Sequence, residues 1–230
     1  MQKNTTNQAD TLEVWDLPVR LFHWALVSLV IGAVVTANLP IAYMEWHMRI
    51  GYAILTLLIF RVLWGLTGPY YARFQNFIYS PKTVLKYAQS LFIKHKDQRY
   101  LGHNPLGALM VFLMLLLLVI QAVSGLFSSD DIFTDGPLVR KVSGDLSDFF
   151  TGVHHTNIIL LVIAIIVHIC ANLAYWLFKK ENLIAPMIHG RKEKTGAEDW
   201  VPQTQAKPVW LALICFAISA LIVFYIVEIY

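Results

Sequence analysis

The chain has 230 residues, of which 57% are hydrophobic and only 14% are charged, and its formal net charge is +3. Soluble domains carry about 25% charged residues. The mean hydropathy of +0.56 is that of an integral membrane protein. This composition excludes a soluble globular enzyme and a nucleic-acid-binding protein, and the length suits a single domain.

Five apolar stretches are each long enough to cross about 30 Å of hydrocarbon. No strand-like alternation persists anywhere in the chain, so we expect an all-α membrane protein. The flank before the first stretch has one lysine and three acids, which favours a retained helix over a signal peptide. The predicted spans are residues 19–39, 48–68, 106–127, 156–178 and 209–229.

Lysine and arginine are distributed unequally between the two sides of these spans. Fourteen of them fall on the side of the amino terminus, three fall on the opposite side, and Arg61 lies inside the second span. Positive residues accumulate on the cytoplasmic side. We therefore expect a multi-pass protein of the bacterial inner membrane, with a cytoplasmic amino terminus and a periplasmic carboxy terminus.

The periplasmic side is correspondingly acidic. A solvated loop would have this composition, but so would a docking surface that attracts a basic periplasmic protein by charge. The acidic residues are Glu45, Asp130, Asp131, Asp135, Asp145 and Asp148.

Between the spans, turn and cap signals divide the chain. Residues 1–13 form a polar tail, and residues 191–208 form a cytoplasmic linker to the last span, 209–230. Ser80-Pro81 predicts the start of an interfacial helix over 81–93, and Asn104-Pro105 predicts the start of the third span.

His154 and His168 are the most informative residues of the sequence. They lie fourteen residues apart on one apolar stretch, and at about 100° per residue both rings face the same side of a helix. At about 1.5 Å per residue they stand roughly 21 Å apart, one near each membrane surface. Imidazoles are rare in hydrocarbon unless they have a function.

Two other histidines match them in depth. His47 begins the second span on the outer side, and His23 lies near the inner end of the first. A b-type haem takes two imidazoles from facing helices. We therefore predict two b haems, one held by His47 and His154 and the other by His23 and His168. Without a C-x-x-C-H motif, a covalently attached haem is excluded.

Several nearby residues could assist these sites. Gly51 follows His47 by one turn and leaves room for a flat porphyrin. Arg20 and Arg61 could pair with haem propionates or lie at the interface as snorkelling cations. His103 precedes the cap of the third span, so we do not expect its side chain to face the bundle; it could bind a propionate, a quinone or nothing.

His155 is the alternative to His154 as a ligand. It lies thirteen residues before His168 and is rotated by about 140° to the other side of the helix. The tryptophans near span ends fit an interfacial belt. They are Trp15, Trp24, Trp46, Trp64 and Trp176.

Several motifs together resemble a known family. The run Trp15-Asp16-Leu17-Pro18-Val19-Arg20-Leu21-Phe22-His23-Trp24 is similar to the amino-terminal signature of the b-type cytochrome subunits of Ni,Fe-hydrogenases and of bacterial cytochrome b561. His47-Met48-Arg49-Ile50-Gly51, Gly102-His103-Asn104-Pro105, the His154 and His168 pair and Lys180-Glu181-Asn182-Leu183 resemble later motifs of that family. The resemblance covers about residues 14–190.

The resemblance implies a four-helix transmembrane haem-binding bundle over 14–190, to which this chain adds a fifth helix. It implies electron transfer between a periplasmic partner, such as a c-type cytochrome or a hydrogenase, and the quinone pool. An electron-transfer subunit is favoured over a stand-alone oxidoreductase. The alternatives are a superoxide:quinone oxidoreductase or ferric reductase that acts alone, and a haem-free membrane anchor.

Overall fold

The computed structural model describes residues 11–91, 99–130, 132, 134–194, 196–201 and 206–229. Within these residues five helices are long and apolar enough to cross a membrane. This confirms the predicted all-α class and the approximate positions of the spans. The spanning helices are α1 (Leu17–Ala37), α2 (Met44–Thr67), α4 (Pro105–Leu126), α5 (Gly144–Phe178) and α7 (Val209–Phe224, continued by a π-helical turn, Tyr225–Ile229).

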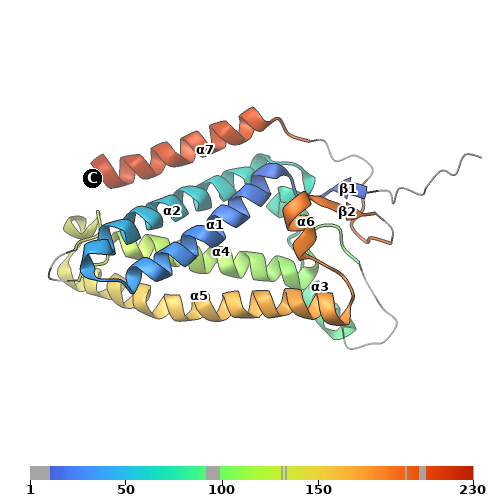
Figure 1. The fold of residues 1–230 in the computed structure, drawn as a ribbon, viewed down its shortest axis with the longest axis horizontal. Coiled ribbons are helices and arrows are strands. Elements are labelled where there is room, and N and C mark those ends of the chain that lie inside the picture. The colour runs from blue at the N-terminus through green and yellow to red at the C-terminus, as the bar shows by residue number, and fades with distance from the viewer. Residues whose placement is uncertain are drawn as a thin grey trace, which may run out of the picture.

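Helices α1, α2, α4 and α5 form an elongated bundle, and α7 lies along its outside (Figure 1). α1 and α2 pack against each other, as α4 and α5 do, and α2 also contacts α4 and α7. Half of the residues in the most apolar stretch of α2 are buried, a larger share than in any other spanning helix of the described residues. The second helix is therefore the centre of the bundle, and Leu58 and Trp64 are almost fully enclosed.

Side-chain caps start several helices at the predicted residues. Asn104 Oδ1 accepts a hydrogen bond from Gly107 N at 2.8 Å, and Pro105 occupies the first helical position. Ser80 caps α3 (Pro81–Ser90), a short helix that ends three residues before the predicted boundary. Each cap satisfies an N–H group that has no partner within the helix.

α5 is longer than the sequence analysis predicted. It begins at Gly144 rather than Thr156 and runs for 35 residues, about 52 Å at 1.5 Å per residue. Its first three turns include Asp145, Ser147 and Asp148, whose polarity conceals a helix that continues beyond the apolar stretch. His154 therefore lies inside the helix and not at its start.

Short elements gather at one end of the bundle. Strand β1 (Thr11–Glu13) pairs antiparallel with β2 (Arg191–Glu193), so the end of the predicted tail and the start of the predicted linker are docked on each other. α6 (Ile184–His189) lies beside β1 and β2 (Figure 1). We call this end, with α3, the basic end.

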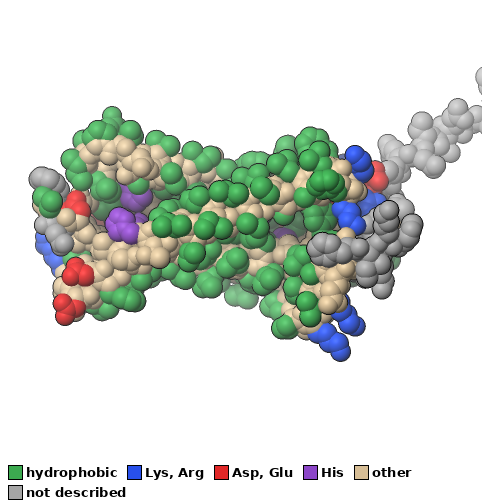
Figure 2. Space-filling view, turned by 90° about the horizontal axis from the view of Figure 1, so that it is seen from below, with side chains coloured by type: hydrophobic (Ala, Val, Ile, Leu, Met, Phe, Trp, Pro, Cys, Tyr) green, Lys and Arg blue, Asp and Glu red, His purple; other side chains and the backbone are tan. Residues whose placement is uncertain are grey.

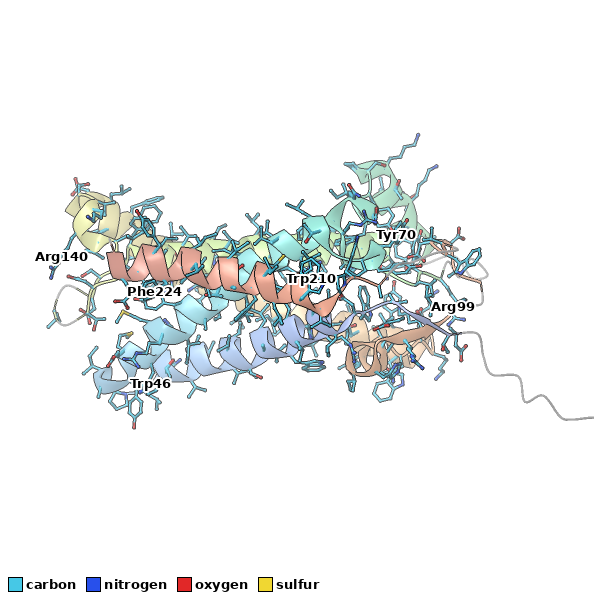
Figure 3. The ribbon with its side chains drawn as sticks, turned by 90° about the horizontal axis from the view of Figure 1, so that it is seen from above. Trp46, Tyr70, Arg99, Arg140, Trp210 and Phe224 are labelled. Atoms are coloured by element: carbon cyan, nitrogen blue, oxygen red, sulfur yellow. The ribbon has the colours of Figure 1, made fainter. Side chains whose placement is uncertain are left out.

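The opposite end carries the acidic residues that the sequence analysis assigned to the periplasmic side, and we call it the acidic end. Figure 2 shows several acidic side chains at this extremity and most of the lysine and arginine side chains of the visible face at the other. Figure 3 places Trp46 and Arg140 at the acidic end and Tyr70 and Arg99 at the basic end. Asp131 and the amino-terminal ten residues lie outside the described residues.

Two of the five tryptophans do not belong to an interfacial belt. Trp64 is completely buried and Trp15 is 6% exposed, whereas Trp24, Trp46 and Trp176 are exposed as predicted. Trp64 Nε1 donates a hydrogen bond to Asp16 Oδ2 at 2.8 Å. Burial raises the pKa of Asp16, and the hydrogen bonds from Trp64 and from Val19 N oppose that rise.

α7 packs against α2 through a line of small side chains. Ala212, Cys215 and Ser219 are buried on this face, and Phe216 meets Phe60 with ring centroids 6.2 Å apart. Small residues let helix backbones approach closely in a membrane. Cys215 is thus a packing residue on this face.

Candidate functional site

His47 of α2 and His154 of α5 face each other near the acidic end of the bundle. Their ring centroids are 6.2 Å apart and the rings are inclined at 87°. His154 is half-buried, whereas the adjacent His155 is exposed, with its ring centroid 6.2 Å from that of His154. The histidine favoured by helical phase is therefore the one that points into the bundle.

Each ring of this pair is held by a backbone carbonyl through its Nδ1. His47 Nδ1 lies 2.9 Å from Ala33 O of α1, and His154 Nδ1 lies 2.9 Å from Gln121 O of α4. A carbonyl oxygen only accepts hydrogen bonds, so both Nδ1 atoms carry the proton. Both Nε2 atoms are therefore left with a free lone pair, the form in which imidazole binds a metal.

The spacing of the pair fits one haem iron. A metal held by both imidazoles would form a bond of about 2 Å to a nitrogen of each ring, and each nitrogen lies roughly 1 Å from its ring centre, so the two centroids would lie about 6 Å apart. The observed 6.2 Å agrees with this value. A Cβ added at Gly51 would meet no atom within 4 Å, so the predicted porphyrin-facing position is sterically open.

The sequence analysis did not identify three residues that support His154, namely Gly125, Gln121 and Asn157. A Cβ at Gly125 would lie 3.0 Å from His154 Cε1, so glycine is needed there for the ring to pack. Asn157, which is 4% exposed, donates to Leu117 O and to Gln121 Oε1. Polar amides inside apolar helices were the available signal, because such groups are costly in hydrocarbon.

α5 presents one continuous face to the bundle. Its most buried positions beyond His154 are Asn157, Leu161 and Ala164, and His168 continues the same three- and four-residue spacing. His154 and His168 therefore share a face of one helix. The fourteen residues between them correspond to roughly 21 Å along its axis.

At the basic end, His168 and His23 of α1 lie close enough to interact electrostatically. His23 Nδ1 is buried without a hydrogen-bond partner. His168 Nε2 is 3.4 Å from Asn172 Nδ2 on the next turn of α5. A buried imidazole nitrogen without a hydrogen-bond partner is unusual in a protein, so this end of the bundle also holds an imidazole that the chain itself does not satisfy.

The ring of His103 lies within the protein, contrary to the sequence-based expectation. It is 4.7 Å from the ring of Trp15 and 4.4 Å from that of Phe77, and its Nδ1 is buried without a partner. Desolvation lowers the pKa of His103 to about 3, and the positive charges of Arg61 and Lys192 add to the effect. His103 is therefore neutral at physiological pH.

The two candidate arginines also lie at the basic end. Arg61 is 4% exposed, its Nη1 donates to Ala72 O at 3.1 Å, and its guanidinium is 4.5 Å from the Phe74 ring centre. Arg20 Nη1 donates to Ile188 O at 2.5 Å, and its Nε is buried without a partner. The burial of Arg61 is inconsistent with a cation that snorkels to the interface.

Facing pairs of imidazoles within a membrane-spanning helical bundle are typical of b-type cytochromes. Comparison with known proteins agrees with this class. The family model described as prokaryotic cytochrome b561 matches residues 14–190. The chain therefore belongs to the prokaryotic cytochrome b561 family, and it is a haem-binding, electron-transferring membrane protein.

Curated relatives bear the name "Probable Ni/Fe-hydrogenase B-type cytochrome subunit". The protein from Rhizobium leguminosarum bv. viciae is 24% identical over 229 residues, covering 84% of this chain and 93% of the relative. Its counterpart from Azotobacter vinelandii is 26% identical over 209 residues, covering 77% of this chain and 86% of that relative. No solved structure matches the chain significantly. α7 lies beyond the residues that the family model matches.

Proposed function

We propose that this chain is a transmembrane diheme cytochrome b that transfers electrons between a periplasmic redox protein and quinone in the inner membrane. The observation that carries the proposal is the His47–His154 pair. Its spacing, the anchored Nδ1 atoms and the open position at Gly51 all fit a haem held by two imidazoles.

His47 and His154 would hold one haem, the outer haem, and His23 and His168 would hold the other, the inner haem. When bound, each haem supplies a centre that accepts and releases one electron. The carbonyls of Ala33 and Gln121 orient the imidazoles of His47 and His154 through their Nδ1 atoms. Because α5 provides a ligand to each haem, it sets their separation across the membrane.

The basic end supplies the remaining partners of the second haem. Arg61 and Arg20 lie at the same end as His23 and His168, and a guanidinium matches a propionate carboxylate in geometry and charge. The unpaired Nε of Arg20 is the more available donor. Quinone would exchange electrons at this end. We infer that this end faces the cytoplasm, because lysine and arginine accumulate on the cytoplasmic side of membrane proteins.

The periplasmic partner would bind at the acidic end. A basic c-type cytochrome suits this surface by charge. The names of the relatives point instead to a hydrogenase. Both partners would deliver or receive electrons at the haem of His47 and His154, which lies near that end.

Electron exchange with a basic soluble c-type cytochrome is expected to depend on salt. Charge steering is screened over about 10 Å at 0.1 M salt, so the second-order rate should fall roughly tenfold between about 0.01 M and 0.15 M salt. Asp145 and Asp148 are exposed, and replacing both by Asn should lower the low-salt rate. Stopped-flow spectroscopy measures it. Glu193→Gln, at the basic end, is the matched control, and a rate independent of salt would contradict this docking surface.

Haem content tests the proposal directly. Two b haems per polypeptide are expected by the pyridine haemochrome assay on protein purified from haem-supplied cells. One haem would mean that only one histidine pair is correct, and the absence of haem would favour the membrane-anchor alternative. Turnover of superoxide or ferric ion by the isolated protein would favour the stand-alone enzyme.

A further inference from the structure

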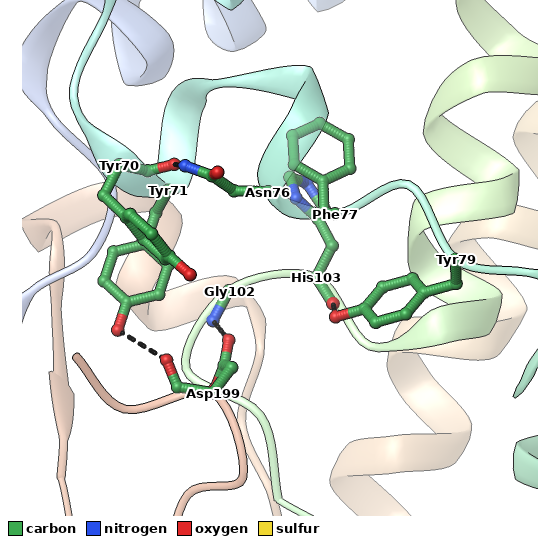
Figure 4. Close-up of a pocket in the computed structure, with 8 residues that line it drawn as sticks. All are labelled: Tyr70, Tyr71, Asn76, Phe77, Tyr79, Gly102, His103 and Asp199. Carbon is green, nitrogen blue, oxygen red and sulfur yellow. Dashed lines mark hydrogen bonds between the residues drawn. The ribbon is translucent and has the colours of Figure 1, made fainter.

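A small polar cavity lies at the basic end, beside His103. It has a volume of about 10 Å³, is partly open to the surface and is lined by Tyr70, Tyr71, Asn76, Phe77, Tyr79, Gly102, His103 and Asp199 (Figure 4). A volume of this size holds about one water molecule. The lining combines aromatic carbon with hydroxyl, amide and carboxylate groups that can hydrogen-bond to water, so water is a suitable occupant.

One wall of the cavity is formed by Asp199, which lies beyond the residues that the family model matches. Asp199 accepts hydrogen bonds from Leu101 N at 2.6 Å and Gly102 N at 2.8 Å, and its carbonyl accepts one from Tyr71 at 3.1 Å. A Cβ at Gly102 would lie 2.9 Å from Tyr71 Cδ1 and 3.2 Å from Asp199 Oδ2. Glycine therefore permits this close approach, which fixes the loop before His103.

His103 connects this cavity to the interior. Tyr79 donates to the His103 carbonyl at 3.0 Å, while the ring packs between Trp15 and Phe77. Arg61, Lys192 and His168 are the charged or titratable groups that act on the ring from α2, β2 and α5. His103 thus lines the cavity and is also influenced electrostatically by His168, and its Nδ1 is buried without a hydrogen-bond partner.

We propose that His103 and the water cavity form the route by which protons pass between the cytoplasm and quinone at the inner haem. This inference rests on the proposed function. Oxidation of one hydroquinone to quinone releases two electrons and two protons. The two electrons pass to the haems one at a time. Each proton is accepted by one ring nitrogen of His103, while the other ring nitrogen releases a proton to water in the cavity. Quinone reduction takes the same two electrons and two protons in reverse.

A neutral imidazole is suited to this role. It has one N–H donor and one acceptor nitrogen, so it passes a proton without a lasting change of charge. The low pKa of His103 disfavours a trapped imidazolium in this desolvated position. Positioned proton transfer contributes typically 10²–10⁴-fold to a rate.

The test compares His103→Phe with wild type in the full-length, haem-loaded protein. Phenylalanine preserves the aromatic packing against Trp15 and Phe77 and cannot carry a proton. Haem content, the reduced α-band and the midpoint potentials from reductive titration should be unchanged. Haem reduction by decylubiquinol should slow at least tenfold in its maximal rate, with an unchanged half-saturating quinol concentration. His189→Phe, which removes an exposed histidine at the same end, should behave as wild type.

The outcomes separate the two proposals. If wild type is reduced by quinol and His103→Phe matches it, the proton route is overturned while the electron-transfer function stands. If His103→Phe loses a haem, His103 holds the cofactor instead and the proton route is wrong. If the haem-loaded wild type fails to react with quinol, the quinone function and the proton route both fail.

Discussion

Replacing His154 by alanine is expected to remove one of two haems and leave the other in place. The variant deletes one of two imidazoles that face each other at 6.2 Å, and a single remaining imidazole would hold the outer haem weakly. His23 and His168 are unaffected at the far end of the bundle. Haem content per polypeptide should therefore fall by half in the pyridine haemochrome assay.

His155→Ala is the matched control for this experiment. It removes the adjacent histidine, which is exposed and makes no ring contact with His47, so both haems should remain. If His154→Ala keeps the haem of His23 and His168, its helical bundle has folded. Equal losses in the two variants would contradict the helical phase on which the ligand assignment depends.

The second large effect is expected at Gly51. An added Cβ there meets no atom of the chain within 4 Å, so Gly51→Leu should leave the helical bundle intact. A leucine side chain would nevertheless occupy the space one turn from His47 that a porphyrin face requires. We expect Gly51→Leu to lose the outer haem as completely as His47→Ala.

Gly152→Leu controls for the insertion of a large side chain beside the same site. Gly152 lies on α5, two residues before His154, is exposed and also has an open Cβ position. It should retain two haems. Circular dichroism and the melting temperature of haem-free protein check that both variants fold. Retention of both haems by Gly51→Leu would contradict the proposed orientation of the outer haem.

The class of the protein and its spans could be predicted from the sequence because hydropathy and helical phase are local properties. Apolar length identified the five spans, and a fourteen-residue spacing placed His154 and His168 on one face. The helix cap at Asn104 could also be predicted, because capping depends on the residues next to the helix start. The largest boundary error was the start of α5, because its first turns are polar and do not belong to the apolar stretch.

Contacts between distant segments were decided by the tertiary structure. The carbonyls of Ala33 and Gln121 that fix the imidazole tautomers come from neighbouring helices, and every residue has a carbonyl, so no sequence pattern marks them. The inward ring of His103 and the docking of Asp199 on Leu101 and Gly102 likewise depend on how loops fold back over the basic end. A helix repeats its own geometry, so its faces follow from residue spacing. The partner that each face meets depends on packing, which brings together residues that are far apart in the chain.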